Sequence, residues 1–121
     1  MKKIVLILIC FTIISCKKDV QKSEKLYPER ASLDKGKQLF KENNCAACHQ
    51  NNQKIIGPSL EQVATVYKKQ NASLKNFLKA QSEPIIDPAQ YETMKINLEL
   101  TKVMSDDELE SLETYILSFS K

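Results

Sequence analysis

The amino-acid sequence predicts an all-α fold of about four to five helices, and three observations support this class. Apolar residues in several segments after residue 32 recur at intervals of three and four, as they do on one face of a helix. No segment shows a convincing strand pattern. A capping-box sequence at residue 105 introduces a well-defined last helix. The chain has 121 residues, which is the length of one domain.

The first three helices are expected between residues 32 and 83. Serine is favoured at the N-cap, so we expect the first helix to begin at Ser32 and to end near residues 43–44. Its apolar face is formed by Leu33, Gly36, Leu39 and Phe40. A second, short helix is indicated by Leu60, Val63, Ala64 and Tyr67. A third is indicated by Leu74, Phe77 and Leu78, and it should end before Pro84.

The last helix has the clearest start signal in the chain. Ser105 is followed three residues later by Glu108, and this pair can satisfy two backbone N–H groups reciprocally. The acidic first turn also suits the positive end of the helix dipole. Its buried stripe is expected to contain Leu109, Leu112, Ile116 and Phe119, with Tyr115 alongside.

The N-terminal segment predicts export from the cytoplasm. Two lysines precede an apolar run over residues 4–14, which is too short to span a bilayer but has the length of a signal-peptide core. The run ends in Ile13-Ile14-Ser15-Cys16, which resembles the lipobox of bacterial lipoproteins. In that class the cysteine becomes the first residue and carries the lipid. The alternative is an ordinary cleaved signal that happens to contain a cysteine.

These features divide the chain into three parts. Residues 1–15 are a lipoprotein signal peptide, residues 16–31 a lipidated flexible tether, and residues 32–121 the folded domain. The chain has 18 basic and 15 acidic side chains, and loss of two lysines with the signal leaves 16 against 15. No basic face remains, so nucleic acid is not an expected partner.

The sequence Cys45-Ala46-Ala47-Cys48-His49 carries the predicted chemistry. On a helical turn, positions i, i+3 and i+4 share a face, so both thiols and the imidazole point the same way. The thiols can then add to the two vinyl groups of a haem while the imidazole binds its iron. This pattern is typical of c-type haem attachment, which takes place outside the cytoplasm. It predicts one covalent haem c at Cys45 and Cys48, with His49 as an iron ligand.

Three other interpretations compete for the same motif. A structural zinc site needs a fourth ligand, but His49 is the only histidine and no further cysteine remains after Cys10 and Cys16 are assigned. A thioredoxin-type redox pair needs a βαβ surrounding, which the sequence lacks. A disulfide between Cys45 and Cys48 would strain so short a loop.

Residues 32–121 resemble the class I cytochrome c family in its small bacterial form. The family's first helix carries a glycine and, four residues later, an aromatic residue, matched by Gly36 and Phe40. The attachment motif follows, and then a Gly-Pro-x-Leu stretch, matched by Gly57-Pro58-Ser59-Leu60. The resemblance implies the cytochrome c fold, with helices wrapped around the haem. It also implies that the Pro58 carbonyl accepts a hydrogen bond from His49, and that Gly36 lets the first helix approach the last one near Leu112 and Tyr115.

The resemblance further implies a methionine as the second iron ligand. Met94 lies in a stretch expected to be a loop, and Met94-Lys95-Ile96-Asn97 is similar to the family's Met-Pro-Pro-Asn, although both prolines are missing. In that pattern Asn97 can hydrogen-bond the thioether. The other candidate is Met104, which directly precedes Ser105 and is explained by packing against Leu109 as a hydrophobic staple. Met94 has no such structural explanation, so Met94 is the expected iron ligand.

Together these features predict a monohaem one-electron carrier of a respiratory or related chain, not an enzyme. The expected partners are an oxidase or reductase and, through Cys16, a membrane on its periplasmic side. The alternatives are a haem enzyme or gas sensor with an open sixth position, and a non-shuttling subunit of a membrane oxidoreductase complex.

Overall fold

A computed structural model describes the backbone of residues 20–121 and the side chains from residue 29 onward. The predicted signal peptide and Cys16 lie outside the described residues. The elements are α1 (Val20–Glu42), η1 (Cys45–Ala47), α2 (Leu60–Gln70), α3 (Leu74–Leu78), η2 (Pro88–Gln90), α4 (Tyr91–Thr101) and α5 (Asp106–Leu117), where η marks a 3-10 turn. Over residues 20–121 the only β pairing is an isolated bridge between His49 and Lys54. The predicted all-α class is confirmed.

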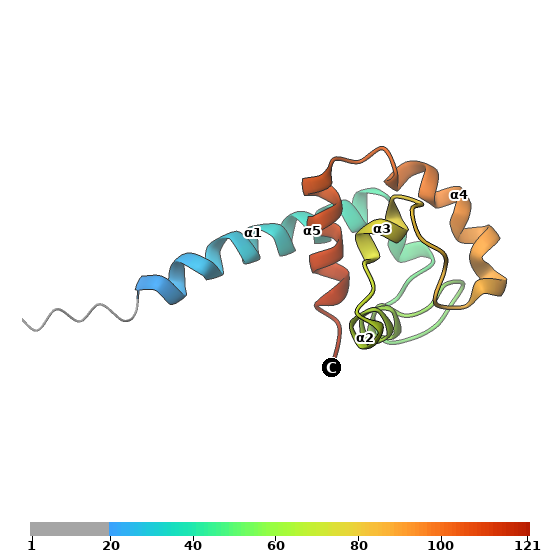
Figure 1. The fold of residues 1–121 in the computed structure, drawn as a ribbon, viewed down its shortest axis with the longest axis horizontal. Helices are drawn as coiled ribbons and strands as arrows, with labels where there is room; N and C mark the ends of the chain where they lie inside the picture. The colour runs from blue at the N-terminus through green and yellow to red at the C-terminus, as the bar shows by residue number, and fades with distance from the viewer. Residues whose placement is uncertain (1–19) are drawn as a thin grey trace, which may run out of the picture.

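The packing of α1 against α5 organises the fold, and α1 projects away from the other helices towards its N-terminal end (Figure 1). A Cβ atom on Gly36 would lie 1.9 Å from the carbonyl oxygen of Ser111 and 2.7 Å from the Cβ of Tyr115. Only glycine therefore allows this approach. The rings of Phe40 and Tyr115 lie 5.4 Å apart beside the crossing. The interpretation of Gly36 as the close-contact residue between these helices is confirmed.

The core lies where α5 meets α1, α2 and α3. Leu109 and Leu112 of α5 are almost fully buried, as their place in the predicted stripe requires. Apolar side chains from the other helices close around them. The buried cluster comprises Phe40, Leu60, Val63, Tyr67, Leu74, Leu78, Leu109, Leu112 and Ile116.

Serine caps begin the later helices. The Ser59 hydroxyl accepts the N–H of Gln62 at the start of α2, and Ser73 does the same for α3. At α5, the Ser105 side chain accepts the Glu108 N–H, and the Glu108 carboxylate accepts the Ser105 N–H at 2.8 Å. The predicted capping box is therefore confirmed.

The predicted start of the first helix is wrong. α1 begins at Val20, so Ser32 lies inside it and is no N-cap. The preceding segment is rich in lysine, glutamate and glutamine, which are good helix formers, and the helix continues through it. Residues 20–31, expected to be a flexible tether, are thus helical. The Ser32 hydroxyl instead lies 3.4 Å from that of Ser111.

The expected loop around Met94 is also a helix. α4 spans Tyr91–Thr101, and Met94 lies in its first half. Residues 89–103 contain neither proline nor glycine, so nothing interrupts the helix that follows Pro88. Ion pairs at i, i+3 between Glu92 and Lys95, and between Glu99 and Lys102, support it. The absence of the two prolines was the signal for this helix.

None of the helices within residues 20–121 is both long enough and apolar enough to cross a membrane.

Candidate functional site

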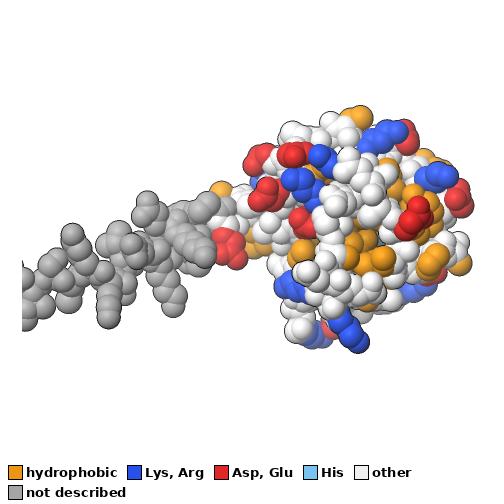
Figure 2. Space-filling view, viewed as in Figure 1, with side chains coloured by type: hydrophobic (Ala, Val, Ile, Leu, Met, Phe, Trp, Pro, Cys, Tyr) orange, Lys and Arg blue, Asp and Glu red, His pale blue; other side chains and the backbone are white. Residues whose placement is uncertain are grey.

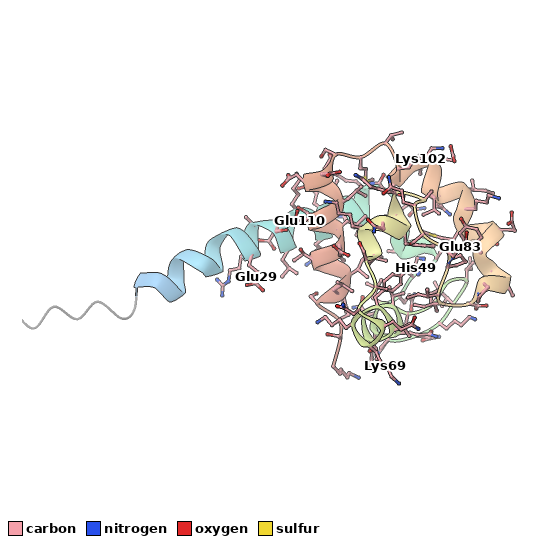
Figure 3. The ribbon with its side chains drawn as sticks, in the orientation of Figure 1. Glu29, His49, Lys69, Glu83, Lys102 and Glu110 are labelled. Carbon is pink, nitrogen blue, oxygen red and sulfur yellow. The ribbon has the colours of Figure 1, made fainter. Side chains whose placement is uncertain are left out.

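A large apolar cavity opens between η1, α2, α3, α4 and α5. About 1210 Å³ of space inside it is free of atoms, counting the open mouth and the solvent there. Figure 3 shows His49 in the region that α2, α3 and α4 enclose. The predicted site residues that line the cavity are Cys45, Cys48, His49, Pro58, Met94 and Asn97.

A tight turn directs the cysteines and the histidine to the cavity. Asn44 takes a left-handed conformation (φ 55°), and the 3-10 turn η1 follows at once. The N–H groups of Cys48 and His49 both donate to the carbonyl of Cys45, at 3.1 Å and 3.0 Å. Residues at i, i+3 and i+4 therefore share one side, as expected from the sequence. Ala46 and the following alanine are exposed, so the small residues face away from the cavity.

The two thiols are free and half-buried. Burial raises the pKa of the Cys45 thiol, with the neighbouring Cys48 adding to the shift, so the thiol stays protonated at neutral pH. Over the described residues, no group of three or more histidine, cysteine or acidic side chains could hold a metal ion. The structure thus lends no support to the zinc interpretation, and the two cysteines are not joined as a disulfide.

His49 is held in one tautomer. Its Nδ1 lies 2.7 Å from the carbonyl oxygen of Pro58. A carbonyl can only accept, so Nδ1 is the protonated nitrogen and Nε2 keeps its lone pair. The hydrogen bond expected between these residues is therefore present. Such a bond orients a ligating imidazole and raises its basicity.

The glycine before Pro58 has a steric reason. A Cβ atom on Gly57 would lie 2.5 Å from Cε1 of His49 and 2.9 Å from its Nδ1. Any side chain here would occupy the space of the imidazole, so the glycine backbone itself forms one wall of the ring's pocket.

Backbone hydrogen bonds tie the loop after His49 to α2. The Gly57 N–H donates to the Cys48 carbonyl at 2.8 Å. The N–H of Leu60, in the first turn of α2, donates to the carbonyl of Gln50 at 2.8 Å, and that of Glu61 donates to Asn51 at 2.9 Å. These N–H groups have no partner inside their helix, so the loop satisfies them. The histidine side of the cavity is thus defined largely by backbone contacts.

The two candidate methionines are placed differently. Met94 is half-buried on α4 and lines the cavity. Met104 is also half-buried and packs against the core, but it is not among the residues that line the cavity. Asn97 lines the cavity as well, although its side-chain amide donates to the Thr93 carbonyl, one turn earlier in α4, at 3.2 Å.

Two cavity residues were missed as site residues by the sequence reasoning. Tyr67 was expected only as a packing residue, but its ring lines the cavity and burial raises its pKa to about 12, so the phenol stays neutral. Thr101 was not singled out because its segment was expected to be a loop. It is buried, and its hydroxyl donates to the carbonyl of Leu78 at 2.6 Å.

These residues fit a haem. Two free thiols and an imidazole with a free Nε2 face a cavity whose other lining is mostly aliphatic and aromatic, and a thioether lies on a separate element. Cys45 and Cys48 would hold the cofactor covalently, and His49 would bind its iron.

Comparison with known proteins identifies the family. The family model described as cytochrome c matches residues 33–120, which is most of the chain. A comparison with curated proteins gives no match.

Proposed function

The chain belongs to the cytochrome c family, and from this premise we propose that it is a monohaem one-electron carrier with His49 and Met94 as iron ligands. Family membership makes it a c-type haem electron-transfer protein, with haem c as its cofactor. The ligand pair, a single haem, and a place in a respiratory or related chain are the proposed refinements.

The observation that carries the proposal is that His49 and Met94 line the same cavity from separate elements, whereas Met104 does not. His49 presents its unprotonated Nε2, because Nδ1 donates to Pro58. Met94 offers an uncharged thioether. With both groups bound, no iron position is left for a substrate, which is why we propose a carrier and not an enzyme.

When bound, haem supplies an iron that gains and loses one electron. The protein's contribution is the environment. Leu74, Leu78, Leu112 and Ile116 give the inner wall of the cavity an aliphatic lining that limits access of water. A methionine ligand and a dry surrounding both raise the potential within the haem range.

We also propose that the protein is anchored outside the cytoplasm by lipid on Cys16. The apolar run over residues 4–14 and the cysteine after it support this assignment. α1 projects away from the cavity, and α4 lies at the opposite end of the domain (Figure 1). An anchor at the N-terminal side would leave the cavity end free for an oxidase or reductase.

A pair of methionine variants tests the ligand assignment. Met94→Leu removes the thioether and leaves the side-chain volume nearly unchanged, so it should erase the methionine–iron charge-transfer band of the oxidised protein, lower the potential, and open the iron to carbon monoxide. Met104→Leu is the matched control and should keep the band, at a stability cost below about 1.5 kcal/mol. An exchange of the two phenotypes would identify Met104 as the ligand. An unchanged spectrum in both variants would favour a haem enzyme or gas sensor with an open sixth position.

The anchor has its own test. Cys16→Ser should abolish lipid labelling of the expressed protein and prevent cleavage of its signal peptide. Membrane fractionation and mass spectrometry of the mature N-terminus give the readout. A soluble wild-type protein that begins at a residue other than Cys16 would exclude the lipoprotein assignment.

A further inference from the structure

The helix that carries Met94 has two apolar sides, and one of them is buried. Met94, Leu98 and Thr101 lie at i, i+4 and i+7, so they share one side of α4. Leu98 is 1% exposed and Thr101 4% exposed. A second side carries Ile96, which is 75% exposed, and Val103 follows just beyond the helix with 78% of its surface exposed. Leu100 lines the cavity.

Apolar burial alone does not explain this choice. The hydrophobic effect is non-directional and grows with the apolar area removed from water. A helix rotated about its own axis could bury Ile96 and Val103 in place of Met94 and Leu98, which exchanges one pair of apolar side chains for another. Figure 2 shows hydrophobic side chains at the surface of the α4 end of the domain, among charged ones. Hydrophobic burial is therefore a weak guide to the rotation, and a directional contact can decide it.

A single polar contact distinguishes the two rotations. The Thr101 hydroxyl donates to the carbonyl of Leu78, and both residues are 4% exposed. Leu78 is the last residue of α3, so its carbonyl has no acceptor role within that helix. The preceding carbonyls of α3 are satisfied by the chain itself: Lys79, Gln81 and Ala80 donate to Lys75, Asn76 and Phe77 respectively.

Among the described residues, this is the only side-chain hydrogen bond or ion pair that joins α4 to another element. Lys95 pairs with Glu92, Lys102 pairs with Glu99, and Asn97 donates to Thr93, all within α4 or at its end. The remaining side-chain contact of note is apolar: the rings of Tyr91 and Phe77 lie 6.3 Å apart.

We propose that Thr101 is a positioning residue that sets the rotation of α4 and thereby directs Met94 towards the iron. This inference rests on the proposed ligation by Met94. Rotation of α4 would leave the Leu78 carbonyl buried without a donor, and that cost favours the observed orientation. Hydrogen bonding thus selects the ligand-presenting orientation.

Thr101→Val separates this idea from simple packing. Valine has nearly the same shape and is more apolar, so if α4 were held by burial alone, the variant would be neutral or stabilising. We expect instead that the variant weakens the binding of Met94 to the iron. The ratio of methionine-bound to methionine-free ferric protein should fall about tenfold, as for a buried carbonyl that loses its donor. The charge-transfer band, the potential and the rate of carbon monoxide binding report it.

Two variants control the experiment. Thr101→Ser keeps the hydroxyl and should restore the wild-type band and potential. Thr114→Val removes a hydroxyl that donates within α5, to the carbonyl of Glu110 at 2.8 Å, and should leave both unchanged. An unaltered spectrum in Thr101→Val, together with loss of the band in Met94→Leu, would overturn the inference while leaving the ligand assignment intact. An unaltered spectrum in Met94→Leu itself would instead overturn the assignment.

A second substitution tests the competing side of α4 directly. If the rotated helix buries Ile96, then Ile96→Gln makes that rotation unfavourable. Added to Thr101→Val, it should restore the methionine–iron charge-transfer band. Should the single variant fail to accumulate as holoprotein, the double variant still decides. A methionine-bound spectrum in Thr101→Val/Ile96→Gln supports the inference, and a methionine-free spectrum contradicts it.

Discussion

The wall of the cavity that carries His49 and the wall that carries Met94 are held in place by different kinds of contact. On the histidine side, Pro58 accepts from the imidazole, Gly57 packs against its ring, and backbone hydrogen bonds join the loop to α2. On the methionine side, α4 has two buried residues, Leu98 and Thr101.

This difference indicates which ligand can be lost first. Contacts made by the backbone within a few residues of His49 leave the imidazole little freedom. Met94 depends on a helix whose attachment rests on few side chains, and regions with few buried contacts open at lower free energy than the core. We therefore expect the loop around His49 to tolerate no local change in structure, whereas α4 can shift and carry Met94 with it.

Gly57→Ala should have the largest effect, because it acts on the rigid wall. The new Cβ would need the space of His49 Cε1, 2.5 Å away, so either the ring or the loop must move. We expect the yield of correctly ligated holoprotein to collapse. Haem content and the ferric spectrum measure this. Ala47→Gly, at an exposed position of the attachment turn, is the control. A Gly57→Ala protein with a normal spectrum would show that this wall is not rigid.

Leu98→Ala should have the next largest effect, because it removes a buried side chain of α4 on the methionine side of the cavity. Removal of a buried leucine side chain costs about 2–5 kcal/mol of unfolding free energy. Because Leu98 anchors α4, we also expect loss of the methionine–iron band well below the global unfolding midpoint in denaturant.

Leu109→Ala is the matched comparison for that result. Leu109 is equally buried, but it lies on α5 in the core. Its removal should cost a similar free energy while the band disappears only with global unfolding. Identical behaviour of the two variants would mean that α4 does not open separately.

The pH dependence of stability tests Tyr67, which lines the cavity from α2. Burial raises the pKa of its phenol to about 12, from 10.0. Above pH 10 the unfolded chain ionises this group before the folded one does, so its stabilising contribution is full below pH 10 and is lost as the pH rises towards 12. The stability difference between wild type and Tyr67→Phe should change only in this window, as measured by urea unfolding at each pH. A constant difference from pH 8 to 12 would contradict the burial of the phenol.

The smallest effect is expected at the ion pair that connects the two walls. Lys54, which forms the backbone bridge with His49, pairs with Asp87, which precedes η2 and α4. Lys54 is 54% exposed at its side chain, so the pair should contribute below about 1 kcal/mol. Lys54→Gln should lower stability by that amount at low salt and by less at high salt. A change in the spectrum would show that the two walls are coupled through this pair.

Much of the histidine wall was predictable from the sequence because its signals are local. The attachment motif and Gly57-Pro58 each lie within a few residues, and short-range geometry sets their structure. The same holds for the capping box that begins α5 at Ser105. The secondary structure of the methionine wall was mispredicted. A resemblance to a proline-containing loop was given more weight than the uninterrupted helix formers around Met94.

The sequence by itself determined the covalent chemistry of this protein and the turn that presents it, because spacing within one helical turn decides which side chains share a face. It also determined that two methionines were candidates. Only the tertiary structure showed where each methionine lies: Met94 lines the cavity and Met104 does not. The reason is that the rotation of α4 depends on the Leu78 carbonyl, 23 residues away along the chain from Thr101, and no local pattern encodes such a partner.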